Sequence, residues 1–241
     1  REYSAGTSRL ALPSFEMRQA ADGGLRFTGT ARASGPLPGG FVRDLALPVD
    51  GNYSAAGELA LWRHCTDVRF SRLQYANLTV RGRAITLCPE NGAPILRNSR
   101  GDLRIAARAP SLDVSGNLGS TPIALSSGAL RFAYPGVLDI RNVKAAIGPK
   151  ATATLFRIRG LQARLEPGGA IGGVFDDADV TIANVPLDLL GTSGNWTYAG
   201  GALSLGEAGF VLQDRADPDR FEPLDARNAT LTLRANRIVA A

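Results

Sequence analysis

Gly101-Asp-Leu-Arg-Ile-Ala-Ala-Arg108 contains, in one short stretch, the pattern that decides the fold of this chain. Leu103 and Ile105 alternate with polar residues. Successive side chains of a strand point to opposite faces, so the two apolar side chains share one face. The same Gly-x-Leu-x-apolar spacing recurs at Gly23-Leu25-Phe27, Gly57-Leu59-Leu61, Gly128-Leu130-Phe132 and Gly201-Leu203-Leu205. The repeated pattern predicts strands that each carry one apolar face.

A companion pattern, Ala-x-apolar-x-apolar, strengthens the prediction of an all-β fold. It recurs at Ala76-Leu78-Val80, Ala178-Val180-Ile182 and Ala229-Leu231-Leu233. The one segment with helix signals is short, with Pro186 at its start and Gly191 at its end. Many short strands in succession are typical of an antiparallel meander with few or no helices.

The apolar strand faces must be covered, either by a second sheet or by a ligand such as an acyl chain. Hydrophobic residues make up 44% of the chain, but aromatic residues only 7%, and there are 28 glycines and 14 prolines. Alanine and leucine supply much of the apolar content, which favours a thin or open core. A closed-core β-sandwich, or a β-helical adhesion or assembly module without lipid transport, is the alternative.

The candidate residues of an apolar groove follow from the alternation within each predicted strand. They are Leu59, Leu61, Val68, Phe70, Leu78, Val80, Ile85, Leu87, Leu103, Ile105, Leu112, Val114, Ile123, Leu125, Leu130, Phe132, Leu138, Ile140, Phe156, Ile158, Val180, Ile182, Leu203, Leu205, Phe210, Leu212, Leu231 and Leu233. A groove lined by them would hold acyl chains at about 0.8 kcal/mol per methylene and let them slide.

The charge of the chain limits the classes of partner that it can bind, and its cysteine content bears on the compartment in which it works. The net charge is +5, and all basic residues except Lys144 and Lys150 are arginine. The arginines are scattered among acidic residues, which speaks against nucleic acid and fits solvated strand faces or contact with an anionic envelope component. Two cysteines, Cys65 and Cys88, predict a disulfide if the chain is exported; two reduced cysteines are the alternative.

Catalytic signals are nearly absent, so the chain is predicted to be no enzyme and to hold no cofactor or metal. Its single histidine, His64, is insufficient for a two-histidine metal site. Two acidic groups, Asp176 to Asp179 and Asp214 to Glu222, are interpreted as solvated loops, with Ca²⁺ binding or a pair of glycosidase carboxylates as alternatives. The glycines at 168–169 and 172–173 are interpreted as a turn or bulge.

The chain is expected to be a fragment of a longer protein, because it starts with Arg1 and its only methionine is Met17. The sequence contains no signal peptide and no membrane span, so such segments would lie elsewhere. We expect residues 1–241 to form a single elongated β-groove segment, with a possible break near 89–100.

Three stretches carry a resemblance to a known family. They are Gly101-Asp-Leu-Arg-Ile-Ala-Ala-Arg, Phe175-Asp-Asp-Ala-Asp-Val-Thr-Ile-Ala and Leu224-Asp-Ala-Arg-Asn-Ala-Thr-Leu-Thr-Leu. In them the chain resembles the AsmA-like proteins of the Gram-negative envelope. It is most similar to their YdbH branch (intermembrane phospholipid transport, formerly "dicarboxylate transport"), and TamB-like proteins are next.

The resemblance implies a fold, a location and a partner. Members are anchored in the inner membrane and cross the periplasm as a taco-shaped β structure whose apolar groove carries phospholipid toward the outer membrane. The expected partners are a phospholipid or other envelope lipid and envelope proteins at each membrane. The free sheet edges of a fragment also predict an edge-to-edge dimer. The cysteine pair has no counterpart in what the resemblance implies.

Overall fold

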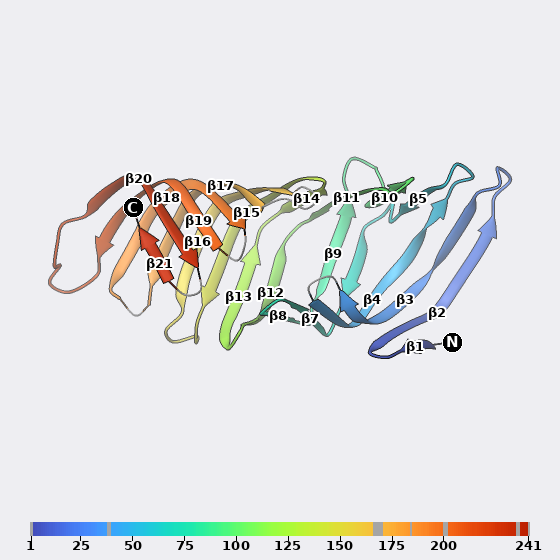
Figure 1. Ribbon diagram of the computed structural model, residues 1–241, viewed down its shortest axis with the longest axis horizontal. Coiled ribbons are helices and arrows are strands. Elements are labelled where there is room, and N and C mark those ends of the chain that lie inside the picture. Colours follow the sequence, from blue (N-terminus) through green and yellow to red (C-terminus); the bar gives the residue numbers. More distant parts are fainter. Residues whose placement is uncertain are drawn as a thin grey trace. The chain divides into compact units, whose positions relative to one another are not determined.

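A computed structural model describes residues 2–37, 40–165, 171–183, 185–199, 202–234 and 237–240. In these residues every regular element is a β strand, and every register between neighbouring strands is antiparallel (Figure 1). The predicted all-β antiparallel fold is therefore confirmed. Gly168, Gly169 and Gly201, which the sequence patterns singled out, lie outside the described residues, as do the side chains of Leu231 and Leu233.

The chain divides into two compact units. Unit 1 comprises Arg1–Ser120 and Arg131–Tyr134, and unit 2 comprises Thr121–Leu130 and Pro135–Ala241. The strands of unit 1 are β1 (Glu2–Ala5), β2 (Ser8–Gln19), β3 (Leu25–Leu37), β4 (Gly40–Tyr53), β5 (Glu58–Leu61), β6 (Thr66–Arg69), β7 (Arg72–Tyr75), β8 (Leu78–Arg81), β9 (Ala84–Pro89), β10 (Leu96–Ser99), β11 (Asp102–Ala109), β12 (Leu112–Leu118) and most of β14 (Leu130–Tyr134). Those of unit 2 are β13 (Thr121–Ser127), β15 (Gly136–Ile147), β16 (Thr154–Leu165), β17 (Ile171–Ile182), β18 (Leu187–Ala199), β19 (Ala202–Asp214), β20 (Leu224–Arg234) and β21 (Arg237–Ala240).

Unit 1 begins as a meander and continues with interrupted strands. Strands β1 to β4 pair in chain order. The far edge of β4 then pairs with three short strands in succession, β5, β6 and β7. Each of these pairs in turn with another short strand, β5 with β10, β6 with β9 and β7 with β8. The interruptions let one long strand be continued by several short ones in the same sheet.

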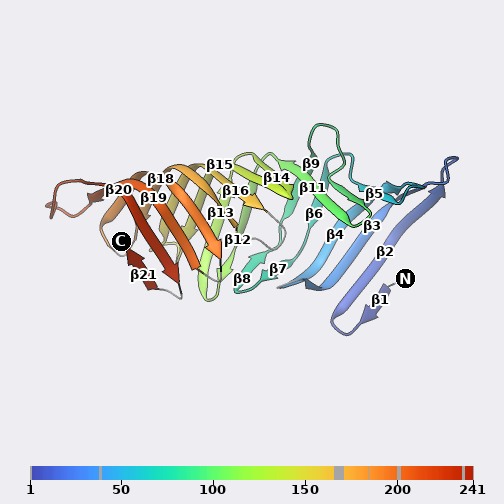
Figure 2. The ribbon, with the colours of Figure 1, turned by 45° about the horizontal axis from the view of Figure 1, so that its top comes forward.

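Unit 2 is a meander of long strands in which each strand pairs with its neighbours in the chain. Strand β13 pairs with β15, and β15 through β21 then pair consecutively. Figures 1 and 2 show β15 to β20 side by side. No described pairing joins β13 to β21, so the sheet of this unit is open and consistent with an open groove.

A line of residues with left-handed backbone crosses the long strands of unit 2. Asn142 in β15, Asp177 in β17, Gly191 in β18, Glu207 in β19 and Asn228 in β20 have φ between 48° and 57°. Asn, Asp and Gly tolerate this conformation best. Register shifts flank the residue in β17, β18 and β19. At these shifts the residue acts as a β-bulge, which bends the strand and shifts its alternation by one residue; at Asn142 the exposure pattern of β15 changes parity without a register shift.

The bulge line also decides the one segment with helix signals. The segment from Pro186 to Gly191 leads into and begins β18, which starts at Leu187. Its Leu187 and Leu189 lie opposite Ile182 and Val180 of β17. Gly191 has φ of +57°, a conformation that ends many helices but here forms the bulge.

Candidate functional site

An uninterrupted apolar row crosses unit 2 at right angles to its strands. Residues directly opposite each other in neighbouring strands share a face. The registers connect one residue of β13 and one residue of each strand from β15 to β20 in this way. The row consists of Leu125, Ala145, Phe156, Val180, Leu189, Leu212 and Leu224. At about 4.8 Å between strands, six steps give a row roughly 29 Å long.

A second apolar strip lies on the other side of the bulge line. Ile140 lies opposite Leu161, Leu161 opposite Phe175, and Trp196 opposite Leu205. In β15 the apolar Leu138 and Ile140 before the bulge are half-buried, and after it the odd-numbered Val143 is buried and Ala145 half-buried. The change of parity at each bulge keeps both halves of a long strand apolar on one face.

Trp196 packs closely against the backbone of the neighbouring strands in this strip. Its indole N–H donates a hydrogen bond of 3.1 Å to the carbonyl oxygen of Gln162 in β16. Gly173 of β17 lies between, directly opposite Trp196, and a Cβ there would come within 1.9 Å of the same carbonyl oxygen. Glycine at this position therefore allows close backbone approach under the indole.

Unit 1 has an apolar row of its own. It runs through β2, β3, β4, β5, β10 and β11 and consists of Met17, Phe27, Gly51, Leu61, Leu96 and Ile105. A second row on the same face, nearer the strand ends, consists of Leu25, Tyr53, Leu59, Asn98 and Leu103. Both rows contain residues that the alternation of single strands pointed to.

The apolar faces are only half covered. In the described part of the chain no large side chain is less than 2% exposed, and the buried apolar residues are mostly alanines, such as Ala107, Ala163 and Ala208. The surface of the chain, 15369 Å², is well above the about 10,300 Å² expected for a compact monomer of its mass. A covering sheet that would close a core over these rows is not seen among the described residues.

The groove residues predicted from the sequence have side chains that are partly exposed in the structure. Every candidate whose side chain is described is intermediate in exposure, except Leu103, which is 38% exposed. Their contact with lipid stays a prediction. The list of groove candidates missed several residues of these rows, namely Met17, Leu161, Phe175, Leu189 and Trp196, and it left out Leu25 and Phe27 although the Gly-x-Leu-x-apolar pattern contains them. In unit 2 the signal that could have found them is the Asn, Asp or Gly in mid-strand, after which the alternation restarts with the opposite parity.

The opposite faces are polar and carry short-range ion pairs. Arg104 pairs with Asp102 at 3.0 Å and Arg141 with Asp139 at 3.0 Å, in both cases two residues apart in one strand. Arg159 of β16 pairs across to Asp177 of β17. Exposed pairs of this kind contribute little to stability, so their main effect is to keep this face solvated.

One carboxylate lies on the apolar side. Asp214, at the end of β19, is directly opposite Leu187, and its side chain is fully covered. It accepts hydrogen bonds from the Arg220 guanidinium at 2.7 and 2.9 Å and from the backbone N–H groups of Ala216 and Arg220, both at 2.9 Å. The Arg220 side chain is the main reason that the pKa of Asp214 lies well below its usual range, against the opposing effect of burial. Asp214 is thus the anchor of the loop that follows β19.

This anchor predicts a pH-dependent stability. Because the pKa of Asp214 is lowered on folding, its contribution is present above the unfolded-state value of about 3.9 and is lost as the pH falls through the native value. Arg220→Gln should therefore lower the melting temperature at pH 7, and the difference from the unaltered chain should shrink toward about pH 2. Arg227→Gln, an exposed arginine in the same unit, is the control. An equal loss at both pH values would contradict the assignment.

The alternative of a Ca²⁺ site finds no support among the residues that the structure describes. In the described residues no group of three or more His, Cys, Asp or Glu side chains could hold a metal ion. Of the first acidic group, Asp177 pairs with Arg159, and Asp179 accepts a hydrogen bond from the Gly191 N–H at 3.0 Å. Within the same residues no helix is long and apolar enough to cross a membrane.

The predicted disulfide is present. Cys65 precedes β6 and Cys88 lies on β9, and these two strands pair with Thr66 opposite Leu87. The bond sits beside the interruption between β5 and β6, where Trp62 has φ of +58°. Trp62 donates its indole hydrogen to the carbonyl oxygen of Pro48 at 2.7 Å. The disulfide therefore joins two short strands where the sheet of unit 1 is least continuous.

Comparison with known proteins gives one match. A family model described as "YdbH-like: Intermembrane phospholipid transport protein YdbH" matches residues 3–240. No curated protein and no solved structure matches the chain. The match covers both units and agrees with the resemblance carried by the strand sequences.

Proposed function

Since the chain belongs to the YdbH-like family of intermembrane phospholipid transport proteins, we propose that it is a periplasmic conduit segment between the inner and outer membranes. Its apolar rows would shield phospholipid acyl chains from water while the opposite face stays solvated. An anchor in the inner membrane and protein partners at the two membranes would belong to other parts of the system.

The observation that carries this proposal is the uninterrupted, half-covered row of unit 2, from Leu125 to Leu224. An uncovered apolar surface of this length is costly in water and marks an interaction site. Each methylene that moves from water onto such a surface contributes about 0.8 kcal/mol. The row is roughly as long as the hydrocarbon core of a bilayer, about 30 Å, and so offers space for complete acyl chains.

The row also suits transport, because no side chain in it selects a fixed position. Its members are aliphatic or aromatic, so an acyl chain finds similar contacts after each step along the row. Movement would then be passive, with its direction set by lipid supply and removal at the ends. The disulfide between Cys65 and Cys88 suits an oxidising compartment such as the periplasm.

The closed-core alternative requires large apolar side chains fully buried between two layers. In the described residues the buried apolar positions are instead mostly alanine, and the Leu and Phe side chains other than Phe175 stay partly exposed. A carbohydrate-active enzyme would need two carboxylates facing one cleft, whereas Asp214 is taken up by Arg220. Both alternatives are therefore weaker than the conduit.

Native mass spectrometry with lipid extraction on the purified chain tests the proposal. We expect phospholipid to co-purify with the chain and, after delipidation, to rebind from added vesicles. A chain that is folded, free of lipid and indifferent to added phospholipid would refute the conduit and favour a module that binds protein.

The free edge of unit 1 predicts self-association. Residues 12–19 of β2 pair only with β3 in the described structure, and this edge exposes Leu12, Phe15 (44%) and Met17 (59%). Exposed apolar edges pair with other strands, so we expect dimers in light scattering at high protein concentration. Phe15→Lys with Met17→Lys should shift the chain to monomer, while Leu37→Lys, an exposed leucine away from this edge, should not. A chain that is monomeric at all concentrations would contradict edge pairing.

A further inference from the structure

Three turns of unit 1 lie along one edge of its sheet, which we call the turn rim. They connect β2 to β3 at 20–24, β4 to β5 at 54–57 and β10 to β11 at 100–101. The registers place them together, because Leu25 lies opposite Tyr53, and Ser99 opposite Glu58. Strand ends from six strands therefore meet at one rim.

The two faces of the sheet differ sharply beside this rim. On the apolar face the nearest row is the one that contains Leu25, Tyr53 and Leu59. One residue further from the turns, on the opposite face, runs a row rich in arginine. It consists of Arg18, Arg26, Asn52, Ala60, Arg97 and Arg104.

The charges in this arginine row are poorly compensated. Arg18 and Arg104 pair with acidic residues of their own strands, but each also lies directly opposite another arginine, Arg26 or Arg97. Like charges directly opposite each other in a sheet are destabilising. The side chains of Arg26, Arg97 and the neighbouring Arg63 make no hydrogen bond or ion pair with any residue that the structure describes. These three guanidinium groups are available to an anion.

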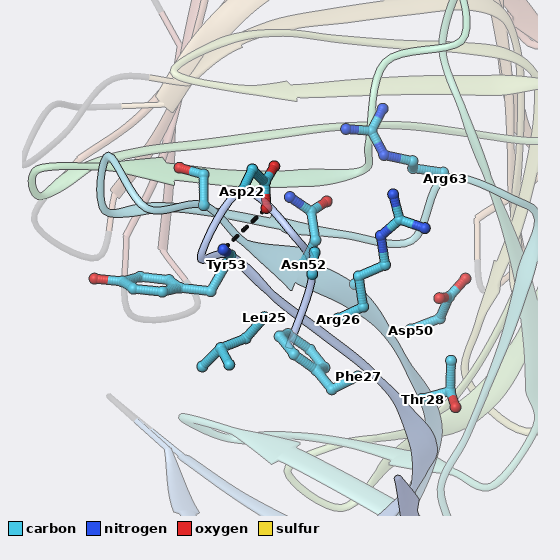
Figure 3. A pocket seen from close by; sticks show the side chains of 13 residues that line it. Asp22, Leu25, Arg26, Phe27, Thr28, Asp50, Asn52, Tyr53 and Arg63 are labelled. Atoms are coloured by element: carbon cyan, nitrogen blue, oxygen red, sulfur yellow. Dashed lines mark hydrogen bonds between the residues drawn. The ribbon is translucent and has the colours of Figure 1, made fainter. Parts of the chain in front are cut away.

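Two hollows at the rim are lined by these arginines, Arg26 in one and Arg97 in the other, and Arg63 lines both. The larger, about 490 Å³, is lined by Arg26, Arg63, Asn52 and Asp50, among others (Figure 3). The smaller, about 240 Å³, shares Asn52 and Arg63 and adds Arg97. Figure 3 shows the Arg26 and Arg63 side chains extending into the same space. Asp50 has no side-chain partner among the described residues and could attract an ammonium group.

The arginine row lies a short distance from the turn rim, at which the apolar face ends. Arg26 is two residues from Gly24 in the turn, and a strand rises about 3.3 Å per residue, so its Cα is roughly 7 Å from the rim. A long arginine side chain can extend along apolar surface and present its charged end at a boundary. A molecule could therefore place an apolar tail on the row that contains Leu25, Tyr53 and Leu59 and an anionic head at the turn rim. It would then contact the apolar row and the arginine row at once.

We propose that Arg26, Arg63 and Arg97 bind the phosphodiester of a phospholipid whose acyl chains lie on the apolar face of unit 1. Guanidinium groups donate paired, charge-assisted hydrogen bonds to phosphate oxygens, with the Asn52 amide beside them. The site makes the conduit selective for phosphate-bearing lipids over neutral lipids with the same chains. This inference rests on the proposed function.

The test compares two lipids with identical acyl chains, a phosphatidylethanolamine and a diacylglycerol, by competition for the delipidated chain in native mass spectrometry. The unaltered chain should prefer the phospholipid by at least about tenfold, since hydrogen bonds to charged groups are the strong ones. The test variant replaces three arginines by glutamine: Arg26→Gln, Arg63→Gln and Arg97→Gln. The matched control makes the same change at three exposed arginines elsewhere: Arg32→Gln, Arg157→Gln and Arg227→Gln.

The expected result is that the test variant loses the preference but still binds diacylglycerol, whereas the control keeps it. A preference that survives in the test variant overturns the headgroup site. Inorganic phosphate alone should bind the delipidated chain much more weakly than the phospholipid does at matched ionic strength; equal or tighter binding would also overturn the headgroup site, because the arginines would then hold a free anion. If the unaltered chain binds neither lipid, the proposed function itself fails, which is a different outcome from the failure of the headgroup site.

Discussion

Val180→Asp is expected to remove most of the bound phospholipid while the chain stays folded. Val180 is in the middle of the apolar row of unit 2, with Phe156 opposite it on one side and Leu189 on the other. Its side chain is half exposed, so an aspartate there can be hydrated in the lipid-free protein. With acyl chains on the row, the same carboxylate would be placed in hydrocarbon, at a cost of about 2.5–3.5 kcal/mol. Phospholipid binding should therefore fall by roughly 50-fold or more.

Thr181→Asp is the matched control, because Thr181 is the next residue in β17 and points to the opposite face. We expect it to retain lipid at the level of the unaltered chain. Lipid per protein would be measured by extraction and native mass spectrometry, and folding by circular dichroism. Equal lipid content in the two variants would show that this row does not hold the acyl chains.

Reduction of the disulfide is expected to have the largest effect on stability. Cys65 and Cys88 are 23 residues apart, and in the chain-entropy model a bond that closes such a loop contributes roughly 3 kcal/mol. The short strands β6 and β9 that it joins have few residues over which to bury apolar surface, so they should depend on it strongly. Hydrogen exchange of residues 66–69 and 84–89 should speed up on reduction by roughly a hundredfold.

Cys65→Ser combined with Cys88→Ser should reproduce this faster exchange and abolish its response to reductant. The long strands β15 to β19 provide the internal reference, since they contain no cysteine and their exchange should change little. Faster exchange of the same size in both units would mean that the bond stabilises more than the paired short strands.

Short-range alternation made the strands and much of the apolar surface predictable. Leu203 with Leu205, and Phe210 with Leu212, were each assigned from local sequence, and the structure leaves these side chains half covered. Alternation could not predict that the two pairs lie on the same face of the sheet. Leu205 and Phe210 are an odd number of residues apart, and the shift of parity at Glu207 between them restores the common face. A glutamate is an unusual residue in left-handed backbone, so the residue type itself does not mark the bulge, and only the nearby Gly206 and Gly209 hint at it.

Gly191 illustrates a different limit. A glycine with positive φ ends helices and also forms bulges in strands, so the residue type alone predicts both. Pro186 added a helix signal, so this segment was the best candidate for a helix, whereas the structure has a strand there. Pairing of Leu187 and Leu189 with β17 decides the outcome, and such pairing involves residues distant along the chain.

The arginine row could not be predicted, for a related reason. Arg26, Arg63 and Arg97 are widely separated in sequence, and each alone is typical of a solvated strand face. Only the registers of β3, β4, β5 and β10 bring them to one rim. The disulfide was easier to predict, since two cysteines in an exported chain leave one possible partner.

The meander of unit 2 has a consequence for how such a structure folds and evolves. Among the described residues, each strand from β16 to β20 pairs only with the strand before it and the strand after it in the chain. Contact order is therefore low, and folding can start at any hairpin and spread to its neighbours, as in repeat proteins. A hairpin can be added or removed without disturbing distant contacts, so the same construction can be lengthened in steps of about 10 Å, two strands at a time.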